Sequence, residues 1–147
     1  MAVDVVTRIV IDRPREVVAN FVSDPSNAPR WYVNIKSVEW KTPPPLEVGS
    51  QVAFVAHFLG RRMAYTYKIT EFVPSQKMVM ATAEGPFPME TSYTWESLGD
   101  ERTGMTLRNR GNPSGFSRIL SPLMVPAMRR ANRKDLARLK LLMEQSS

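Results

Sequence analysis

The sequence contains no cysteine, which excludes disulfide bonds and thiol chemistry. This absence fits the reducing cytosol, and we expect a cytoplasmic location. No apolar run approaches the ~18 residues that a membrane-spanning helix needs. Residues 1–13 mix acidic and basic side chains into an apolar run, so we expect neither a signal peptide nor a membrane anchor there.

Histidine is almost as scarce, since His57 is the only one. Without cysteine and with one imidazole, a zinc site of the usual nitrogen and sulfur ligands is out of reach. Ser-His-Asp hydrolysis is nearly excluded for the same reason. The segment "GNPSG" lacks the strand–loop–lysine context that would make it a phosphate-binding loop. We therefore expect no metal, nucleotide or other cofactor.

The net charge of +6 is unevenly distributed along the 147 residues. Residues 1–112 carry 13 Lys and Arg against 12 Asp and Glu, whereas residues 113–147 carry 7 against 2. The basic character thus belongs to the C-terminal segment, which argues against a general nucleic-acid surface. The length and an apolar content of 43% predict one domain spanning residues 1–147.

Alternation of apolar and polar residues predicts a run of strands joined by short turns. Pro14 and Asp24 predict the starts of two short helices after the first strand. A long helical segment follows Asn112, with a kink or break expected within 118–126 because Pro122 and Pro126 each remove a helical hydrogen bond. The predicted strands span 3–11, 35–41, 50–59, 62–73, 77–84, 89–97 and 104–111.

This order predicts an α+β fold in which the long helix covers one face of an antiparallel meander. A turn at Gly60-Arg61 would place Phe58 opposite Met63, and His57 would then lie on the solvent face with no role in a site. The face toward the helix is rich in aromatic residues and methionine, which is typical of a ligand cavity. The alternative is a core in which these side chains simply pack against the helix.

We expect ligand-binding residues on this face, on the inner side of the long helix and on the turn "GPFP". Phe87 stands on that turn between two prolines, where it either meets a ligand or plugs the end of the core. The predicted ligand-binding residues are Trp31, Phe54, Phe58, Met63, Tyr65, Tyr67, Met80, Phe87, Met89, Thr91, Tyr93, Trp95, Leu107, Asn109, Phe116, Leu120, Met124 and Met128.

The sequence resembles the START-like, Bet v 1-like (SRPBCC) superfamily, in particular its bacterial polyketide cyclase/dehydrase and lipid transport branch. The resemblance covers nearly the whole chain and rests on "DP…RW", "FLGRR", "GPFPMET…YTW" and "DLARLKLLME". It implies a helix-grip fold, a curved antiparallel sheet wrapped on a long C-terminal helix with a cavity between. Members bind sterols, lipids, quinones, polyketides or plant hormones, and a minority are cyclases, aromatases or dehydratases. No family motif assigns catalytic residues in this chain.

The sequence favours binding or transport of a small lipophilic ligand in the cavity. The alternative is a polyketide cyclase or dehydratase, in which Tyr65, Tyr67 or Tyr93 would orient or protonate a ketone oxygen. The other candidates for catalysis of this cyclisation or dehydration are Asn109 and, near the rim of the cavity, Glu84 or Arg30.

A third interpretation is a non-catalytic interaction module that uses the basic C-terminal helix. Its outward cations predict a weak contact with an anionic membrane surface, and we expect no nucleic-acid partner. These cations are Arg130, Arg133, Lys134 and Arg138.

Overall fold

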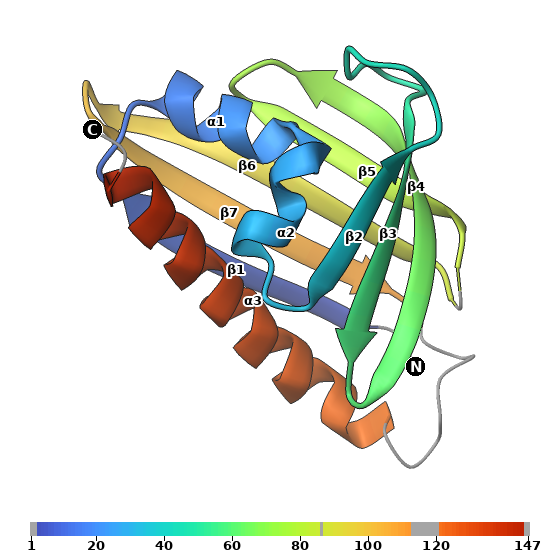
Figure 1. Ribbon diagram of the computed structural model, residues 1–147. Helices are drawn as coiled ribbons and strands as arrows, with labels where there is room; N and C mark the ends of the chain where they lie inside the picture. The colour runs from blue at the N-terminus through green and yellow to red at the C-terminus, as the bar shows by residue number, and fades with distance from the viewer. Residues whose placement is uncertain (1–2, 86, 113–120, 146–147) are drawn as a thin grey trace.

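The computed structural model describes residues 3–85, 87–112 and 121–145 (Figure 1). A strand, three short helical segments and a six-strand meander precede one long helix. In chain order the elements are β1 (Val3–Ile11), α1 (Arg15–Ser23), η1 (Pro25–Asn27), α2 (Ala28–Trp31), β2 (Ile35–Trp40), β3 (Gln51–Phe58), β4 (Arg61–Val73), β5 (Lys77–Glu84), β6 (Met89–Gly99), β7 (Arg102–Gly111) and α3 (Ser121–Gln145).

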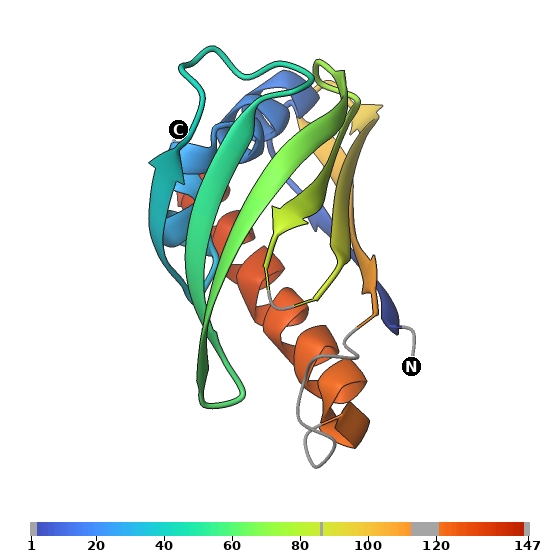
Figure 2. The ribbon, with the colours of Figure 1, turned by 90° about the vertical axis from the view of Figure 1, so that its right-hand side faces the viewer.

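The strands form one antiparallel sheet of seven strands in the order β1-β7-β6-β5-β4-β3-β2. Figures 1 and 2 show that this sheet curves around α3, while α1, η1 and α2 lie over the same concave side. The predicted α+β helix-grip fold is therefore confirmed. Among the described residues, no helix combines the length and apolar character needed to cross a membrane.

The register of the β3–β4 hairpin differs from the prediction by two residues. The turn lies at Leu59-Gly60, both with positive φ, so that Phe58 pairs with Arg61 and Ala56 with Met63. A two-residue turn with positive φ at both positions matches the twist of the flanking strands, and glycine accepts this geometry without strain. Because side chains alternate with a period of two, the error left every residue on its predicted face.

The pairing across β5, β6 and β7 agrees with the prediction. Met80 pairs with Thr91, and Thr91 pairs in turn with Asn109. All three thus share the concave face, whereas His57 is exposed on the other side of the sheet. The face assignment, on which the predicted site depends, is confirmed.

The concave face is filled at the end where α1 covers it. Leu136 and Leu139 of α3 belong to one buried cluster with Trp95 and Leu107 of the sheet and Val18 of α1. Trp95 and Leu107 are 3% and 0% exposed and line no cavity among the described residues. The structure thus places both of these predicted ligand-binding residues in the filled core, because α1 and α3 leave no space beside them.

Helix α3 runs from Ser121 to Gln145 without interruption, with Pro126 inside it. The predicted break therefore does not occur between 121 and 126, while residues 118–120 lie outside the described residues. Pro122 stands in the first helical turn, where a missing N–H costs no helical bond. Buried Met124 and Met128 hold the segment around Pro126 against the sheet. Packing thus compensates for the hydrogen bond that Pro126 cannot make.

Candidate functional site

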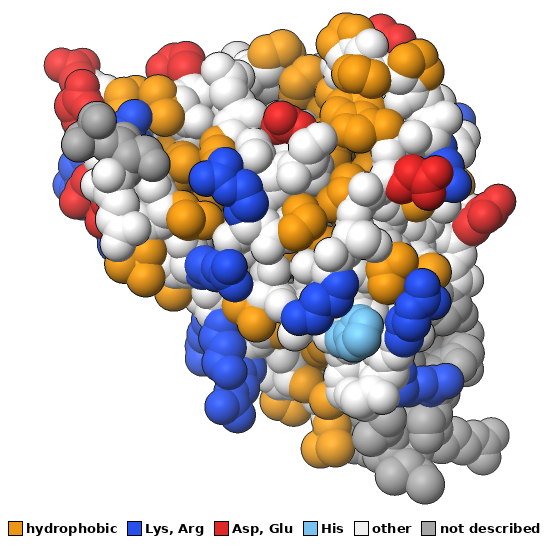
Figure 3. All heavy atoms as spheres, viewed as in Figure 1, with side chains coloured by type: hydrophobic (Ala, Val, Ile, Leu, Met, Phe, Trp, Pro, Cys, Tyr) orange, Lys and Arg blue, Asp and Glu red, His pale blue; other side chains and the backbone are white. Residues whose placement is uncertain are grey.

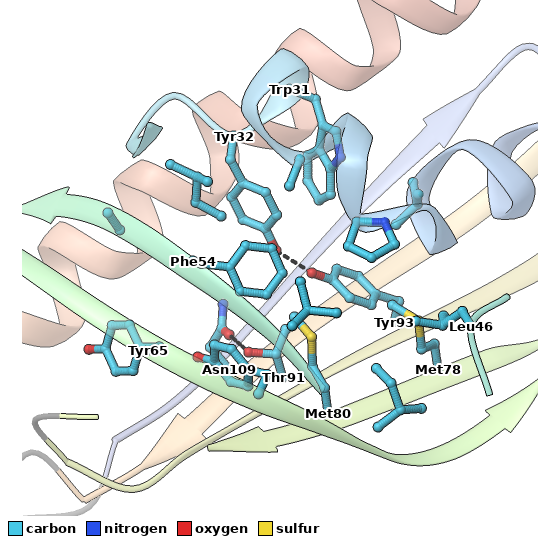
Figure 4. Close-up of a pocket in the computed structure, with 18 residues that line it drawn as sticks. Trp31, Tyr32, Leu46, Phe54, Tyr65, Met78, Met80, Thr91, Tyr93 and Asn109 are labelled. Carbon is cyan, nitrogen blue, oxygen red and sulfur yellow. Dashed lines mark hydrogen bonds between the residues drawn. The ribbon is translucent and has the colours of Figure 1, made fainter. Parts of the chain in front are cut away.

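Two adjoining cavities lie between the sheet and the helices. The first, between the sheet and α2, has a volume of about 120 Å³, and the second, between β3, β4 and α3, about 130 Å³. Figure 4 shows the first cavity with its lining side chains. The residues common to both are Tyr32, Ile35, Ala56, Tyr65, Tyr67 and Asn109.

Six of the 18 residues that line the first cavity are aromatic. The Trp31 and Tyr32 rings lie 3.9 Å apart between centroids, and Trp31 also meets the edge of Tyr93 at 6.1 Å. Phe54 contacts Tyr67 edge to face at 5.8 Å. These rings come from α2, the segment after it, and strands β3, β4 and β6, so the cavity exists only when distant parts of the chain meet. Such a wall binds flat apolar molecules well.

Phe87 closes the end of the second cavity. Its ring is 5% exposed and meets the edge of Tyr65 with centroids 6.0 Å apart and planes at 82°. The preceding Gly85 makes this contact feasible, because a Cβ there would lie 2.6 Å from the Tyr65 Cδ1 atom. Phe87 is thus packed into the end of the core and at the same time lines the second cavity, so both roles expected for it, ligand contact and plug, stay open.

A chain of polar side chains crosses the cavity from the sheet to α3. The Thr91 hydroxyl donates to Asn109 Oδ1 at 2.6 Å, and Asn109 Nδ2 donates to Asn132 Oδ1 at 3.3 Å. Asn132 is only 4% exposed, yet its Nδ2 has no partner within the described residues. Buried polar groups are normally paired, so this N–H group is an exception, which it shares with the indole Nε1 atoms of Trp31 and Trp95.

Four tyrosines around the cavity keep their protons at neutral pH. Burial raises the pKa of Tyr67 to about 12, partly opposed by a hydrogen bond with Thr91. Burial also raises the pKa of Tyr32, Tyr65 and Tyr93 well above the usual value. The Tyr32 and Tyr93 hydroxyl oxygens share a hydrogen bond of 2.5 Å (Figure 4). These phenols are therefore hydrogen-bond donors and not phenolates.

Asp135 is a buried carboxyl group in the wall of the second cavity. It is 3% exposed, and its Oδ1 accepts a hydrogen bond from the Val33 N–H at 2.9 Å, which ties α3 to the segment after α2. Burial raises its pKa from 3.8 to about 7, although the Val33 hydrogen bond and the nearby Arg138 both lower it. Asp135 is thus poised to exchange a proton near neutral pH.

Most of the predicted ligand-binding residues line one or both of the two cavities. Trp31, Phe54, Met80, Thr91 and Tyr93 line the first cavity, and Tyr65, Tyr67 and Asn109 line both. Phe58, Met63, Phe87, Met89, Met124 and Met128 line the second. Phe116 and Leu120 lie outside the described residues. Glu84 and Arg30 are exposed and line neither cavity.

The lining residues that sequence reasoning missed include three with ionisable or hydrogen-bonding side chains, Tyr32, Asn132 and Asp135. Asn132 and Asp135 follow Met124 and Met128 at helical spacing, so the inner face of the helix carried a usable signal. Tyr32 lies just beyond the end of α2, where no periodic pattern assigns a direction to the side chain. Within the described residues no cluster of His, Asp and Glu could hold a metal ion.

Replacing Asp135 by Asn is expected to remove a pH-dependent loss of stability. Between about pH 4 and pH 7 the folded wild type holds a proton on Asp135 that the unfolded chain has lost, so its stability falls as pH rises. At pH 8, Asp135→Asn should therefore have a free energy of unfolding about 2–4 kcal/mol above that of wild type. At pH 4 the two proteins should have nearly the same free energy of unfolding. Urea unfolding at both pH values measures this. Parallel pH profiles of the two proteins would contradict the assignment.

Comparison with known proteins identifies the family. Residues 2–144 match the family model described as polyketide cyclase / dehydrase and lipid transport. Comparison with curated protein sequences gives no match.

Solved structures share this fold at low sequence identity. A START superfamily protein from Mycobacterium smegmatis is 14% identical, with a TM-score of 0.85 over 98% of this chain and 99% of that one. The Zhui aromatase/cyclase from Streptomyces sp. R1128 is also 14% identical, with a TM-score of 0.83 over 99% and 95% of the two chains. Major latex-like protein 151 from Panax ginseng is 15% identical, with a TM-score of 0.75 over 97% of each chain. These similarities confirm the fold, and the family match shows that the chain belongs to the polyketide cyclase/dehydrase and lipid transport family of the START-like, Bet v 1-like superfamily.

Proposed function

We propose that the protein binds or carries a small lipophilic molecule in the two adjoining cavities. The observation that supports this most directly is a pair of adjoining cavities lined mainly by apolar and aromatic side chains, with the buried amide of Asn109 in the wall of both. Lipophilic binding sites combine an apolar lining with a few placed polar groups, as these cavities do. The family description, which includes lipid transport, is consistent with this function.

The volume and lining of the cavities limit the size of the ligand that they can hold. Their volumes of about 120 and 130 Å³ are small beside the ~300–1,000 Å³ of typical ligand sites. A compact molecule of one or two fused rings therefore suits the closed form. Burying ~200 Å² of its apolar surface contributes about 5 kcal/mol toward binding. Met63, Met80 and Met124 line the walls, and their flexible side chains can rearrange around larger ligands.

Ala56 offers a direct test because it lines both cavities. A Trp side chain at this position would fill the passage between them. Ala56→Trp should lower the affinity for the neutral dye N-phenyl-1-naphthylamine by at least ~10-fold, equivalent to about 1.4 kcal/mol. Dye fluorescence on titration with protein measures the change.

Ala64→Trp is the matched control, since Ala64 is exposed on the opposite face of the neighbouring strand β4. It should leave the dye affinity unchanged. Equal binding by both variants, with both folded by circular dichroism, would show that the dye lies outside the cavities and would contradict the proposed function.

The second candidate is a polyketide cyclase or dehydratase, favoured by the buried Asp135 carboxyl with its pKa near 7. As a carboxylate, Asp135 could remove the proton from a carbon between two ketones. The resulting enolate would attack another ketone, whose oxygen would take a proton from a cavity phenol. The carboxylic acid could then give its proton to the departing hydroxyl as water leaves, while the phenolate takes the second proton from the same carbon, so that the carbon–carbon double bond forms and both groups return to their starting states.

Turnover separates this candidate from binding alone. If the protein is an enzyme, Asp135→Asn should abolish ring closure of a linear poly-β-ketone model substrate while leaving dye affinity within about 2-fold of wild type. Product formation followed by mass spectrometry measures ring closure. Equal conversion by wild type, Asp135→Asn and a protein-free sample would leave ligand binding as the function.

The outward face of α3 suits contact with an anionic membrane surface. Arg130, Arg133 and Lys134 are exposed and form no ion pair with any described residue. Figure 3 shows Lys and Arg side chains over the lower half of the face that carries α3 and acidic side chains over its upper half. Basic residues near anionic lipid contribute about 1 kcal/mol each. A membrane thus fits this face better than an uncharged partner.

Replacing Arg130, Arg133 and Lys134 by Glu should abolish sedimentation of the protein with vesicles of 30% phosphatidylserine at low salt. The three basic residues together are expected to contribute about 3 kcal/mol to the free energy of membrane binding. Reversing Lys41, Lys77 and Arg102, which lie elsewhere on the surface, is the matched control and should have little effect. If both variants and wild type stay in the supernatant, an interaction module with a protein partner on α3 becomes the better account of this face.

A further inference from the structure

An open groove adjoins the first cavity at one end of the molecule. It has a volume of about 480 Å³ and lies between α1, η1, β4 and residues 41–50, which connect β2 to β3. Figure 2 shows this connection at the top and the β3–β4 hairpin, on the side of the second cavity and Phe87, at the bottom. Leu46 lines both the groove and the first cavity, and no other described residue does. The Leu46 side chain, at one edge of the group drawn in Figure 4, therefore stands between the two spaces.

The middle of this connection makes no hydrogen bond with any described residue. Its ends are fixed, because the Thr42 N–H donates to the Gln51 carbonyl at 3.3 Å and the Gly49 N–H donates to the Ile69 carbonyl at 2.8 Å. Between these points, residues 43–46 have no hydrogen-bond partner in the described part of the chain. Three of these four residues are prolines, which have no N–H group to donate and restrict the backbone. Side-chain packing thus holds Leu46 in place.

Leu46 would lose little on moving outward. Its side chain is half-buried and packs against the cluster that contains Met78 and Tyr93. Its movement would expose part of one leucine and would break no hydrogen bond to a described residue. At the opposite end, Phe87 is 5% exposed and its ring packs against Tyr65, so opening there would expose a whole aromatic side chain. Of these two positions, Leu46 opens at the lower free energy.

Another wall of the groove is fixed by hydrogen bonds. Trp40 Nε1 donates to Ser26 Oγ at 3.0 Å, and Asp24 Oδ1 accepts from the Ser26 N–H at 3.0 Å, so the end of β2 is tied to η1. Trp40 and Phe72 offer apolar surface in the same groove as Leu46, on which a lipophilic molecule leaving water can bind first. The groove thus combines a fixed apolar surface with one loosely held side chain.

We propose that Leu46 is a lid on the first cavity, and that ligands exchange between this cavity and water through the groove. This inference rests on the proposed binding function and adds the route of exchange. When Leu46 and the prolines beside it move outward, the groove and the cavity become continuous. When they return, Leu46 covers the bound ligand.

Leu46→Ala tests the lid through the rates of dye binding. A cavity that is accessible only in a minor open state is reached more slowly, in proportion to the population of that state. Shortening the lid side chain should therefore raise the association rate constant of N-phenyl-1-naphthylamine by ~5-fold or more, and raise its dissociation rate constant as well. Stopped-flow fluorescence measures both rate constants. Loss of a mere wall contact would raise only the dissociation rate constant.

Val48→Ala is the matched control for this variant. Val48 lies in the same connection, is 60% exposed and lines neither the groove nor the first cavity. The same truncation of an aliphatic side chain should leave both rate constants within ~2-fold of wild type, because it does not change the open population.

Blocking the groove gives a second test that leaves Leu46 in place. The chain has no cysteine, so Asn20→Cys can be biotinylated at a single position, on an exposed residue that lines the groove. Streptavidin bound there should lower both rate constants by ~5-fold or more, because the dye must pass it to reach the cavity. The same label on Ala64→Cys, which is exposed on the convex face of the sheet, is the control and should lower neither.

The outcomes separate the lid from ligand binding itself. An unchanged association rate constant in Leu46→Ala, or unchanged rates when the groove is blocked, would overturn the lid while leaving the binding function intact. If Leu46→Ala does not fold, the blocked groove decides by itself. If wild type binds no dye, the proposed function fails, and the lid fails with it.

Discussion

The fixed contact on which the rest of this structure depends is the packing of the C-terminal half of α3 against the sheet. Leu136 and Leu139 are fully buried, or nearly so, in one cluster with Trp95 and Leu107, and α1 closes the same end. Each fully buried leucine contributes roughly 1.5–3 kcal/mol, so this end holds the helix firmly. Toward its N-terminal half the helix faces aromatic residues and methionines of β3 and β4, which do not fill the space, and the second cavity lies there. The first cavity lies between the sheet and α2.

The buried polar groups act as the second link between the sheet, the helix and the connection after α2. Asn109 of β7 bonds to Asn132 of α3, and Asp135 of α3 accepts from the Val33 N–H. A polar chain in an apolar interior is costly unless it is satisfied, and satisfied chains specify one arrangement of the elements. At the helix end of this chain, Asn132 Nδ2 has no partner among the described residues.

The two cavities lie against different parts of the core. The first is lined by members of the cluster that α1 covers, among them Val22, Trp31 and Tyr93, whereas the second lies at the end closed by Phe87 and is lined by methionines. Membrane contact through α3 would bring the basic face of the helix beside that end. Such an arrangement would let a lipophilic ligand pass between a bilayer and the cavity without crossing much water.

The sequence by itself determined the elements, their order and the faces of the strands, because strand alternation and turn residues are local signals. Even the two-residue error at Leu59-Gly60 left Met63, Tyr65 and Tyr67 on the predicted side, since the side-chain period is two. Only the tertiary structure decided which of these side chains line a cavity and which pack into the core, because the space beside each one depends on where α1 and α3 end. Trp95 and Leu107 alternate onto the same face of β6 and β7 as Tyr93 and Asn109, yet they pack in the core under α1 and line no cavity among the described residues. Tyr32 and Asp135 likewise owe their positions to contacts between residues 61 and 102 apart in the sequence, with the Tyr93 hydroxyl and the Val33 amide, which no local pattern encodes.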